Sequence, residues 1–269
     1  MQVRAESNLF ELCRVQPLIA VRQLGIMSRF FITLSYNGKN YHGWQIQPNG
    51  SSVQETIEKA LSTILRTEIS IVGAGRTDTG VHAKMMIAHF DTDVNFDAKE
   101  LPRRLNCFLP SDIAIQKIEP VADDLHARFS ATKRSYEYHL VTEKDVFCTE
   151  TAYFYPGALD FDAMNEAASK LFNYIDFTSF SKLHTDVKTN NCTIFEARWE
   201  QISPSHWVFH ISANRFLRNM VRAIVGTLLM VGTKKITVDG FCKIIESKDR
   251  CKAGTSAPAH GLYLTEVVY

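Results

Sequence analysis

The chain of 269 residues is long enough for one large or two modest domains, and its 45% hydrophobic and 22% charged residues are ordinary for a soluble globular protein. Thirty basic residues against twenty-nine acidic ones give a formal charge of +1, so any basic surface for a nucleic acid must be local. The most apolar stretch, 223–231, is too short for a membrane span, and the six scattered cysteines form no C-x-x-C pair. We therefore predict no membrane segment, no metal, no disulfide and a cytoplasmic location.

Hydrophobic periodicity predicts an α+β chain in two parts. Charged residues among positions 1–26 break any signal-peptide core, so residues 1–28 are predicted to be a disordered extension. The first domain, 29–128, is predicted to contain strand Phe30–Tyr36, a helix capped by Ser52 and Glu55 and continuing to residue 66, strands Ile69–Val72 and Val81–Phe90, helix Leu101–Cys107 and strand Ile113–Ile118. The second, 129–269, is predicted to contain strand Ser135–Val141, helix Phe161–Leu171, strands Ile194–Gln201 and Trp207–Ser212 and helix Phe216–Val231.

The most informative segment is Gly73–Ala83, which reads GAGRTDTGVHA. It places Asp78 two residues after Arg76 in a loop whose glycines permit tight turns and close approach of a ligand. Arg76 is predicted to keep this carboxylate ionised and oriented, the alternative being a surface turn in which the two residues merely pair. Val81 and His82 stand where a P-loop needs Lys and then Ser or Thr, and Asp78 takes the third glycine position of G-x-G-x-x-G. Both nucleotide-binding glycine loops are therefore excluded.

Basic residues gather in two places in the second half of the chain. Arg215, Arg218 and Arg222 fall at i, i+3 and i+7 on one side of the helix predicted after residue 214, and no acidic residue between 213 and 238 neutralises them. This spacing predicts a phosphate-binding stripe, although a solvated charged face has the same pattern. A second group surrounds an aromatic residue and suits contact with an RNA backbone. Its members are His126, Arg128, Phe129, Lys133 and Arg134.

Six ordered blocks give the chain a resemblance to a known family. The glycine-rich loop around Asp78 closely resembles the active-site loop of the TruA family of pseudouridine synthases, which modify tRNA. The resemblance covers roughly residues 29–269. The other blocks are Tyr36–Gln47, Ser52–Glu55, His126–Ala131 with Tyr136–Tyr138, Asn214–Gly226 and Gly261–Leu264, in the family's order.

The resemblance implies a fold, an activity and partners. The fold is α+β, with the antiparallel sheets of two α+β domains joined into a central sheet that forms a cleft. The activity is isomerisation of uridine to pseudouridine in the tRNA anticodon stem-loop, at positions 38–40, without a cofactor. The resemblance also implies a homodimer that presents one tRNA across both subunits.

The same resemblance implies roles for single residues. Asp78 is the nucleophile and Arg222 reaches it, which leaves the other two arginines of the predicted helix to the RNA. Tyr136 stacks on the extruded base and takes part in proton transfer, and Leu262 closes the pocket over that base. Attack on the base ring, attack at ribose C1′ and a glycal route all stay open at the level of the sequence. The neighbouring Tyr138 is assigned to packing, the usual role of a tyrosine in an alternating strand.

Two functions from other classes compete with this interpretation. A non-catalytic RNA-binding module with the same fold has no use for a carboxylate such as Asp78 near phosphates. A glycosidase-like hydrolase needs a second carboxylic acid as proton donor, and no motif supplies one beside Asp78. Release of tritium from C5 of uridine in tRNA distinguishes isomerisation from both.

Overall fold

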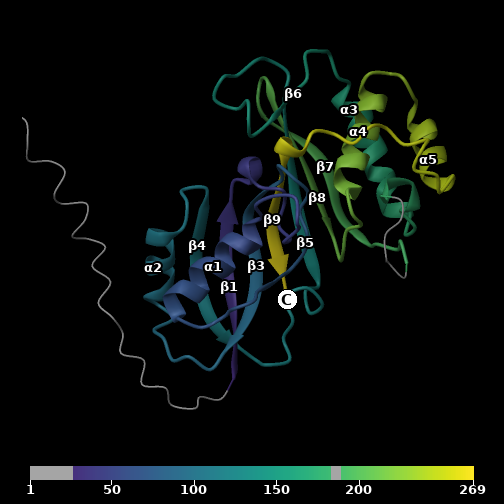
Figure 1. Ribbon diagram of the computed structural model, residues 1–269. Coiled ribbons are helices and arrows are strands. Elements are labelled where there is room, and N and C mark those ends of the chain that lie inside the picture. Colours follow the sequence, from purple (N-terminus) through teal and green to yellow (C-terminus); the bar gives the residue numbers. More distant parts are fainter. Residues whose placement is uncertain (1–26, 183–188) are drawn as a thin grey trace, which may run out of the picture.

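The computed structural model describes residues 27–182 and 189–269 (Figure 1). The described residues form one mixed sheet of nine strands, in which seven follow the order β4-β1-β3-β9-β5-β8-β7, while β2 pairs with β3 and β6 with β5. The strands are β1 (Ser28–Tyr36), β2 (Val72–Gly73), β3 (His82–Thr92), β4 (Ile113–Val121), β5 (Lys133–Val141), β6 (Tyr153–Phe154), β7 (Ile194–Ser203), β8 (His206–Ala213) and β9 (Leu262–Val268). The predicted α+β class with a joined central sheet is confirmed.

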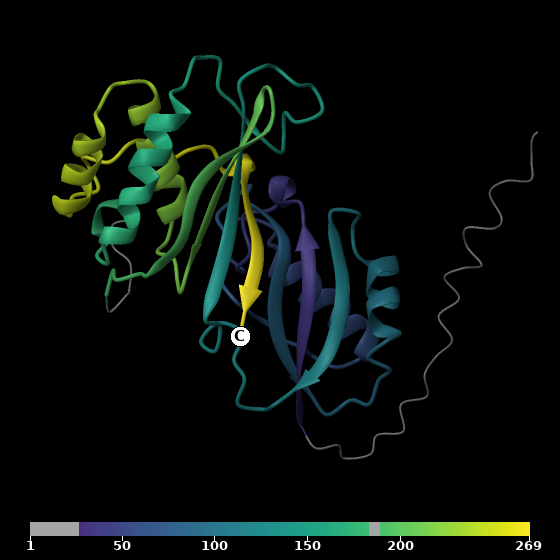
Figure 2. The same cartoon turned by 180° about the vertical axis from the view of Figure 1, so that it is seen from behind.

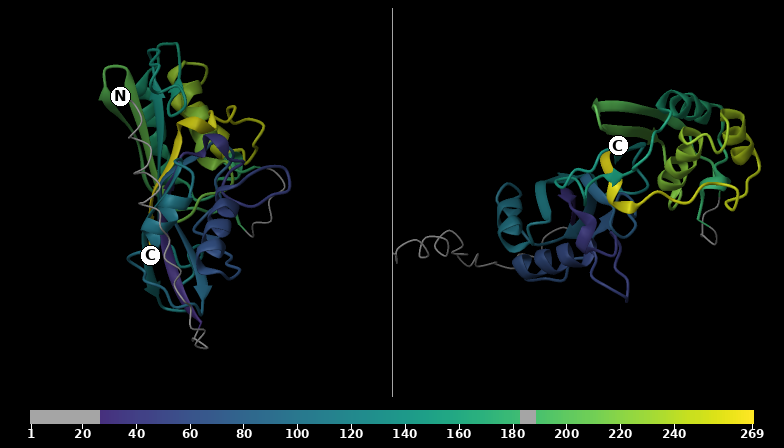
Figure 3. Two further views of the ribbon diagram at one scale, coloured as in Figure 1. Left: turned by 60° about the vertical axis from the view of Figure 1, so that its left-hand side comes forward. Right: turned by 90° about the horizontal axis from the view of Figure 1, so that it is seen from above.

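The helices divide between the two halves of this sheet. They are α1 (Val53–Leu65), α2 (Leu101–Phe108), α3 (Phe161–Lys170), α4 (Met220–Gly232) and α5 (Val238–Glu246). Helices α1 and α2 lie over β1, β3 and β4, whereas α3, α4 and α5 pack on one another beside β5, β7 and β8 (Figures 1 and 3). None of the helices in the described part of the chain is long and apolar enough to cross a membrane.

The two halves meet where β3 and β9 pair in parallel, with His82 opposite Tyr263 and Ala83 opposite Leu264. Along the rest of the seven-strand path the neighbours are antiparallel. Seen from behind, β9 lies between β3 and β5 in the middle of the sheet (Figure 2). The predicted division at residue 128 falls in the segment between β4 and β5 and stays a prediction.

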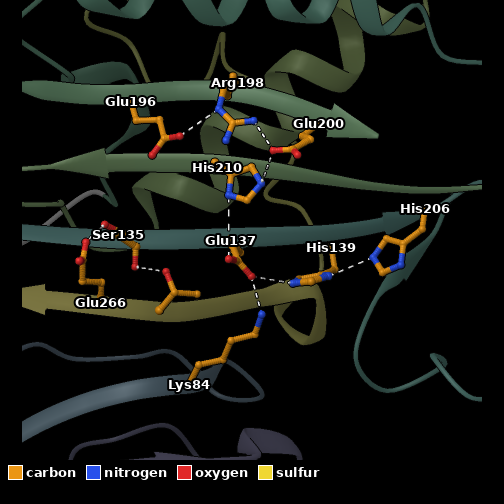
Figure 4. A network of polar contacts seen from close by, with 11 residues as sticks. Lys84, Ser135, Glu137, His139, Glu196, Arg198, Glu200, His206, His210 and Glu266 are labelled. Carbon is orange, nitrogen blue, oxygen red and sulfur yellow. Dashed lines mark hydrogen bonds and ion pairs between the residues drawn. The ribbon is translucent and has the colours of Figure 1, made fainter. Parts of the chain in front are cut away.

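Side chains on one face of the sheet also join the halves. Lys84 of β3 reaches past β9 and donates to Glu137 of β5 at 2.6 Å (Figure 4). Bonds from His139 and then from Lys84 outweigh burial and lower the pKa of Glu137 to about 2. The network continues through His210 to Glu200 of β7. These polar residues alternate along their strands with buried ones, so the opposite face holds the core.

Local sequence signals explain the first helix. Ser52 Oγ accepts a hydrogen bond from the Glu55 backbone N–H at 3.2 Å, which confirms the predicted N-cap. The helix ends at Arg66, which adopts a left-handed conformation with φ of 56°. Its buried residues are Val53, Ile57, Ala60, Leu61 and Leu65, which have the one-sided spacing typical of an amphipathic helix.

Several sequence expectations need correction, and one falls mostly outside the described residues. Helix α4 begins at Met220 instead of Phe216, because Asn219 takes a left-handed conformation with φ of 66° and interrupts the helix there. The strand predicted at 69–72 shortens to β2. Helix α5 was missing from the predicted elements, and β9 was recognised only as a motif. The extension predicted to be disordered, 1–28, lies outside the described residues up to residue 26, while Ser28 already belongs to β1 and corrects the end of that prediction.

Candidate active site

Asp78 lies in the loop between β2 and β3, with 29% of its side chain exposed. The loop is fixed by its own turn, in which the Val81 N–H donates to the Asp78 carbonyl at 3.1 Å, and by the Trp44 N–H, which donates to the Thr77 carbonyl at 3.3 Å. Gly43 permits this approach. Its φ is +88°, and a Cβ there would lie 2.3 Å from the Thr77 oxygen.

Arg222 of α4 is the ion-pair partner of Asp78, with 3.2 Å between its Nη1 and the carboxylate Oδ2. Its Nε donates to the Ala257 carbonyl at 2.7 Å, and the Ala257 N–H donates back to the Arg222 carbonyl at 2.9 Å. Such a partly exposed pair stabilises a fold by about 1 kcal/mol or less. Its consequence is therefore positional, because it fixes one carboxylate oxygen relative to α4.

Tyr136 of β5 is buried close to this pair. Its ring meets Phe216 edge-on, with the centroids 5.1 Å apart and the planes at 87°. Burial raises the pKa of Tyr136 to about 12, an effect that Arg134 opposes and Asp78 reinforces. At neutral pH the residue is therefore a protonated phenol, which can donate a hydrogen bond but is not a ready base.

Leu262 begins β9 and lies opposite Tyr138 of β5, so its side chain faces the same side of the sheet as Tyr136. Both Leu262 and Tyr138 are buried. The Tyr138 hydroxyl donates to the Pro258 carbonyl at 3.0 Å, in agreement with the predicted packing role.

A second tyrosine, which was not among the predicted site residues, supports the loop 74–81 that carries Asp78 between β2 and β3, which we call the acid loop. The Tyr36 hydroxyl and the Thr77 hydroxyl are 2.9 Å apart, next to Asp78 in sequence. Burial raises the pKa of Tyr36, so its hydroxyl also stays protonated. The available signal was that the resembling block 36–47 starts at this residue. The Ala257 carbonyl, in contrast, gives no sequence signal, because any residue could present it.

Arg76 has a different neighbourhood from the predicted one. It is exposed, and the described residues include no ion pair between it and Asp78, whose carboxylate turns to Arg222 instead. Burial, and then the charges of Arg76 and Arg215, lower the pKa of Arg128. Arg76 and Arg215 therefore both lie near Arg128, and the three residues form a local cationic group, which we call the arginine cluster.

The predicted helical stripe of arginines is wrong as a structure. Arg215 and Arg218 precede α4, because the left-handed Asn219 separates them from Arg222. Arg218 is exposed, while the Arg218 carbonyl accepts a bond from the Lys182 N–H at 3.2 Å. The three side chains consequently share no helix face.

The predicted RNA contacts of Lys133 and Arg134 stay predictions, and the structure gives both side chains partners within the protein. Arg134 is only 9% exposed, and its guanidinium donates to backbone carbonyls. Lys133 lies 3.0 Å from Glu266 and points to the face of β5 away from Tyr136. Of Arg128, Lys133 and Arg134, only Arg128 is exposed, and it belongs to the arginine cluster.

A metal site is not apparent in the parts of the chain described, 27–182 and 189–269, where no group of three or more His, Cys, Asp or Glu side chains is arranged to hold an ion. The site brings together the Asp78 carboxylate, the Arg222 guanidinium and the protonated phenol of Tyr136.

Residues 32–130 and 167–269 match the sequence profile of the tRNA pseudouridine synthases. The chain belongs to the tRNA pseudouridine synthase family. A tRNA pseudouridine synthase A of Parabacteroides distasonis is 62% identical over 90% of this chain and 96% of its own length. The tRNA pseudouridine synthase A of Bacteroides thetaiotaomicron is 58% identical over 90% of this chain and 91% of its own length. That of Bacillus subtilis is 43% identical over 90% of this chain and 99% of its own length. The match to the family profile includes the Asp78 loop, Arg222 and Leu262.

A solved structure described as an unknown protein from Galdieria sulphuraria covers 78% of this chain and 94% of its own at 12% identity. Its TM-score of 0.23 is too low to bear on the fold. The tRNA pseudouridine synthase family is thus assigned by sequence, and the confirmed α+β sheet agrees with it.

Proposed function

We propose that this tRNA isomerase converts uridine to pseudouridine at positions 38–40 of the anticodon stem-loop, with Asp78 as the nucleophile. The observation that carries the proposal is the Asp78–Arg222 pair at 3.2 Å, in a partly exposed loop of a chain from the tRNA pseudouridine synthase family. Family membership favours catalysis over a non-catalytic RNA-binding module. A carboxylate beside an RNA site would only repel phosphates unless it had a chemical role.

The reaction balances without a cofactor. The N1–C1′ bond of uridine breaks, the base turns, and a C5–C1′ bond forms while C5 loses a proton and N1 gains one. The Asp78 carboxylate supplies the negative charge or nucleophile at the nucleoside. Arg222, anchored through its Nε on the Ala257 carbonyl, holds that carboxylate in one orientation.

Tyr136 and Leu262 are proposed to hold the extruded base. Tyr136 lies near Asp78 and Leu262 faces the same side of the sheet, and a base out of its helix needs apolar surfaces to replace the lost stacking. With its pKa near 12, the Tyr136 hydroxyl serves as a hydrogen-bond donor instead of the base that removes the C5 proton.

The arginine cluster and Arg218 are proposed to bind the RNA backbone. In the cluster Arg76 and Arg128 are exposed and Arg215 is half-buried, and the concentration of positive charge favours an anionic partner such as phosphate. Phe129, 76% exposed and 5.5 Å below the Arg128 guanidinium, offers a ring for base stacking. Arg218 is a further exposed contact.

A homodimer in the cytoplasm belongs to the same proposal and rests on the family resemblance. Sedimentation of the protein with and without tRNA tests the dimer, and a fully active monomer would contradict it.

The decisive experiment uses tRNA with tritium at C5 of uridine. The wild-type protein is expected to release label and to leave pseudouridine at positions 38–40. Asp78→Asn is expected to release none while tRNA affinity stays within about threefold. Asp91→Asn is the matched control, because Asp91 also pairs with an arginine, Arg29, at 2.7 Å but near the other end of β3. Turnover by Asp78→Asn of even a few per cent of wild type would rule out the nucleophile assignment.

A further inference from the structure

Arg134 of β5 is a buried cation whose bonds all go to backbone oxygens. Its Nη2 donates to the Arg128 carbonyl at 2.6 Å and to the Ala74 carbonyl at 2.8 Å, and its Nε also donates to Ala74 at 3.2 Å. Its Nη1 donates to the Asn214 carbonyl at 3.2 Å and more weakly to the Ala131 carbonyl. Within the described residues it has no carboxylate partner.

A charge in this position needs an explanation. Burial lowers the pKa of Arg134, and a buried cation without an anionic partner is costly to the fold. The planar fork of five N–H donors is the feature that no other side chain offers, because it can satisfy carbonyls from several directions at once. The number and direction of those bonds therefore point to a role in holding chain segments together.

The segments it holds are the three that carry the proposed site. Ala74 begins the acid loop directly after β2, four residues before Asp78. Asn214 opens the segment that leads through Arg215 into α4. The Arg128 carbonyl belongs to the loop between β4 and β5. The Arg134 guanidinium thus bonds Ala74, 60 residues earlier in the sequence, and Asn214, 80 residues later.

The same three carbonyls set the positions of the arginine cluster. Arg76 is two residues after Ala74, Arg215 is next to Asn214, and Arg128 is itself bonded through its carbonyl. After burial, the charges of Arg76 and Arg215 contribute to the lowered pKa of Arg128, so each of them lies near it. The bonds from Arg134 to these backbones fix the positions of the three segments against the repulsion of these charges.

We propose that Arg134 is a positioning residue that holds the acid loop, the Arg128 loop and the segment before α4 in register, so that Asp78 meets Arg222 and the arginine cluster is assembled before tRNA binds. The proposal rests on the function proposed above. Arg134 does not touch the RNA. Its effect reaches the reaction through the backbone of Ala74 and Asn214.

The variant Arg134→Lys tests this role. Lysine keeps the charge and is a good phosphate ligand, but its single ammonium group cannot span carbonyls on three segments. A residue that bound phosphate would therefore tolerate the change. Displacement of the three segments instead predicts a single-turnover rate at saturating tRNA about 10- to 100-fold lower, because a displacement of about 1 Å is enough for such a loss. The tRNA affinity should fall as well, because the arginine cluster is no longer held together.

Hydrogen exchange gives a readout that does not depend on activity. In Arg134→Lys, amides at 73–80 and 214–219 are expected to exchange faster while those of β7 and α5 stay as in wild type. Arg198→Lys is the matched control, since Arg198 lies on β7 with half of its side chain exposed, and it should change neither quantity.

Three results would overturn the proposal. They are a wild-type single-turnover rate in Arg134→Lys, a loss confined to tRNA affinity, and faster exchange spread evenly over the whole chain. Failure of the wild-type protein to release tritium would contradict the proposed function instead. In that case faster hydrogen exchange confined to 73–80 and 214–219 would still support the positioning role of Arg134, and unchanged exchange there would overturn it.

Discussion

Gly226 of α4 is the point where the segment after α5 touches the helix that carries Arg222. A Cβ at this position would lie 1.8 Å from the Thr255 carbonyl oxygen, where about 3 Å is the closest tolerable approach. The substitution Gly226→Ala must therefore move backbone by about 1.2 Å, since no flexible side chain is available to give way. Thr255 is two residues before Ala257, whose carbonyl holds Arg222 Nε, so the displacement is transmitted to the ion pair with Asp78.

Two effects of Gly226→Ala can be estimated. Overpacking costs about 1–3 kcal/mol, and the better helix propensity of alanine returns about 1 kcal/mol, which leaves a net loss of up to about 2 kcal/mol. The single-turnover rate should fall about 100-fold, because the Asp78–Arg222 geometry shifts by a similar distance. This rate loss corresponds to about 2.7 kcal/mol in the activation free energy, somewhat more than the predicted loss in the free energy of unfolding.

Urea unfolding and single-turnover tritium release measure these two quantities. Gly240→Ala is the matched control, because Gly240 also lies in a helix, α5, and its added Cβ would be 3.2 Å from Ile236 Cβ, a contact that small shifts relieve. The control should keep the wild-type rate and nearly the same stability. A wild-type rate in Gly226→Ala would refute the reasoning that the 254–257 segment positions Arg222.

Three further predictions concern charges. Arg222→Ala should lower the single-turnover rate with little change in the salt dependence of tRNA affinity, which parallel rate and binding measurements check. Arg218→Ala should leave the rate at saturating tRNA unchanged and reduce the slope of log affinity against log salt by about one, as a salt titration would show. Burial, and then the charge of Arg29, lowers the pKa of His89 from 6.5 to about 4. Unfolding therefore takes up a proton between these pH values, and the free energy of unfolding falls by about 3 kcal/mol as pH drops from 6.5 to 4. The loss is absent above pH 6.5, and His89→Asn should flatten this part of the stability curve.

Local patterns were sufficient for much of the fold. The alternation in β1 and the Ser52 cap with the apolar face of α1 depend on neighbours in sequence, and both predictions are confirmed. The start of α4 depends on a distant contact. Asn219 Nδ2 donates to the Ser256 hydroxyl at 2.6 Å across 37 residues, a bond that stabilises its left-handed turn and that periodicity does not reveal.

The site shows the same limit more strongly. The spacing of Arg76 and Asp78 suggested a pair, whereas the partner is Arg222, 144 residues further along the chain, which only the family resemblance indicated. Composition made Arg134 look like an RNA contact. Its burial is decided by carbonyls from separate loops, and a backbone carbonyl leaves no trace in the sequence.

The central place of β9 has a consequence for synthesis on the ribosome. This strand follows the other eight described strands in the chain, yet it fills the gap between β3 and β5. Until residues 262–268 have emerged, β3 and β5 of the nascent chain each have an unpaired edge. Such edges can pair with other chains, so the risk of aggregation is highest before β9 is made. A chain released before residue 262 lacks both the parallel pairing of β9 with β3 and the side chain of Leu262. The fold therefore couples the appearance of a complete pocket to the completion of translation through β9.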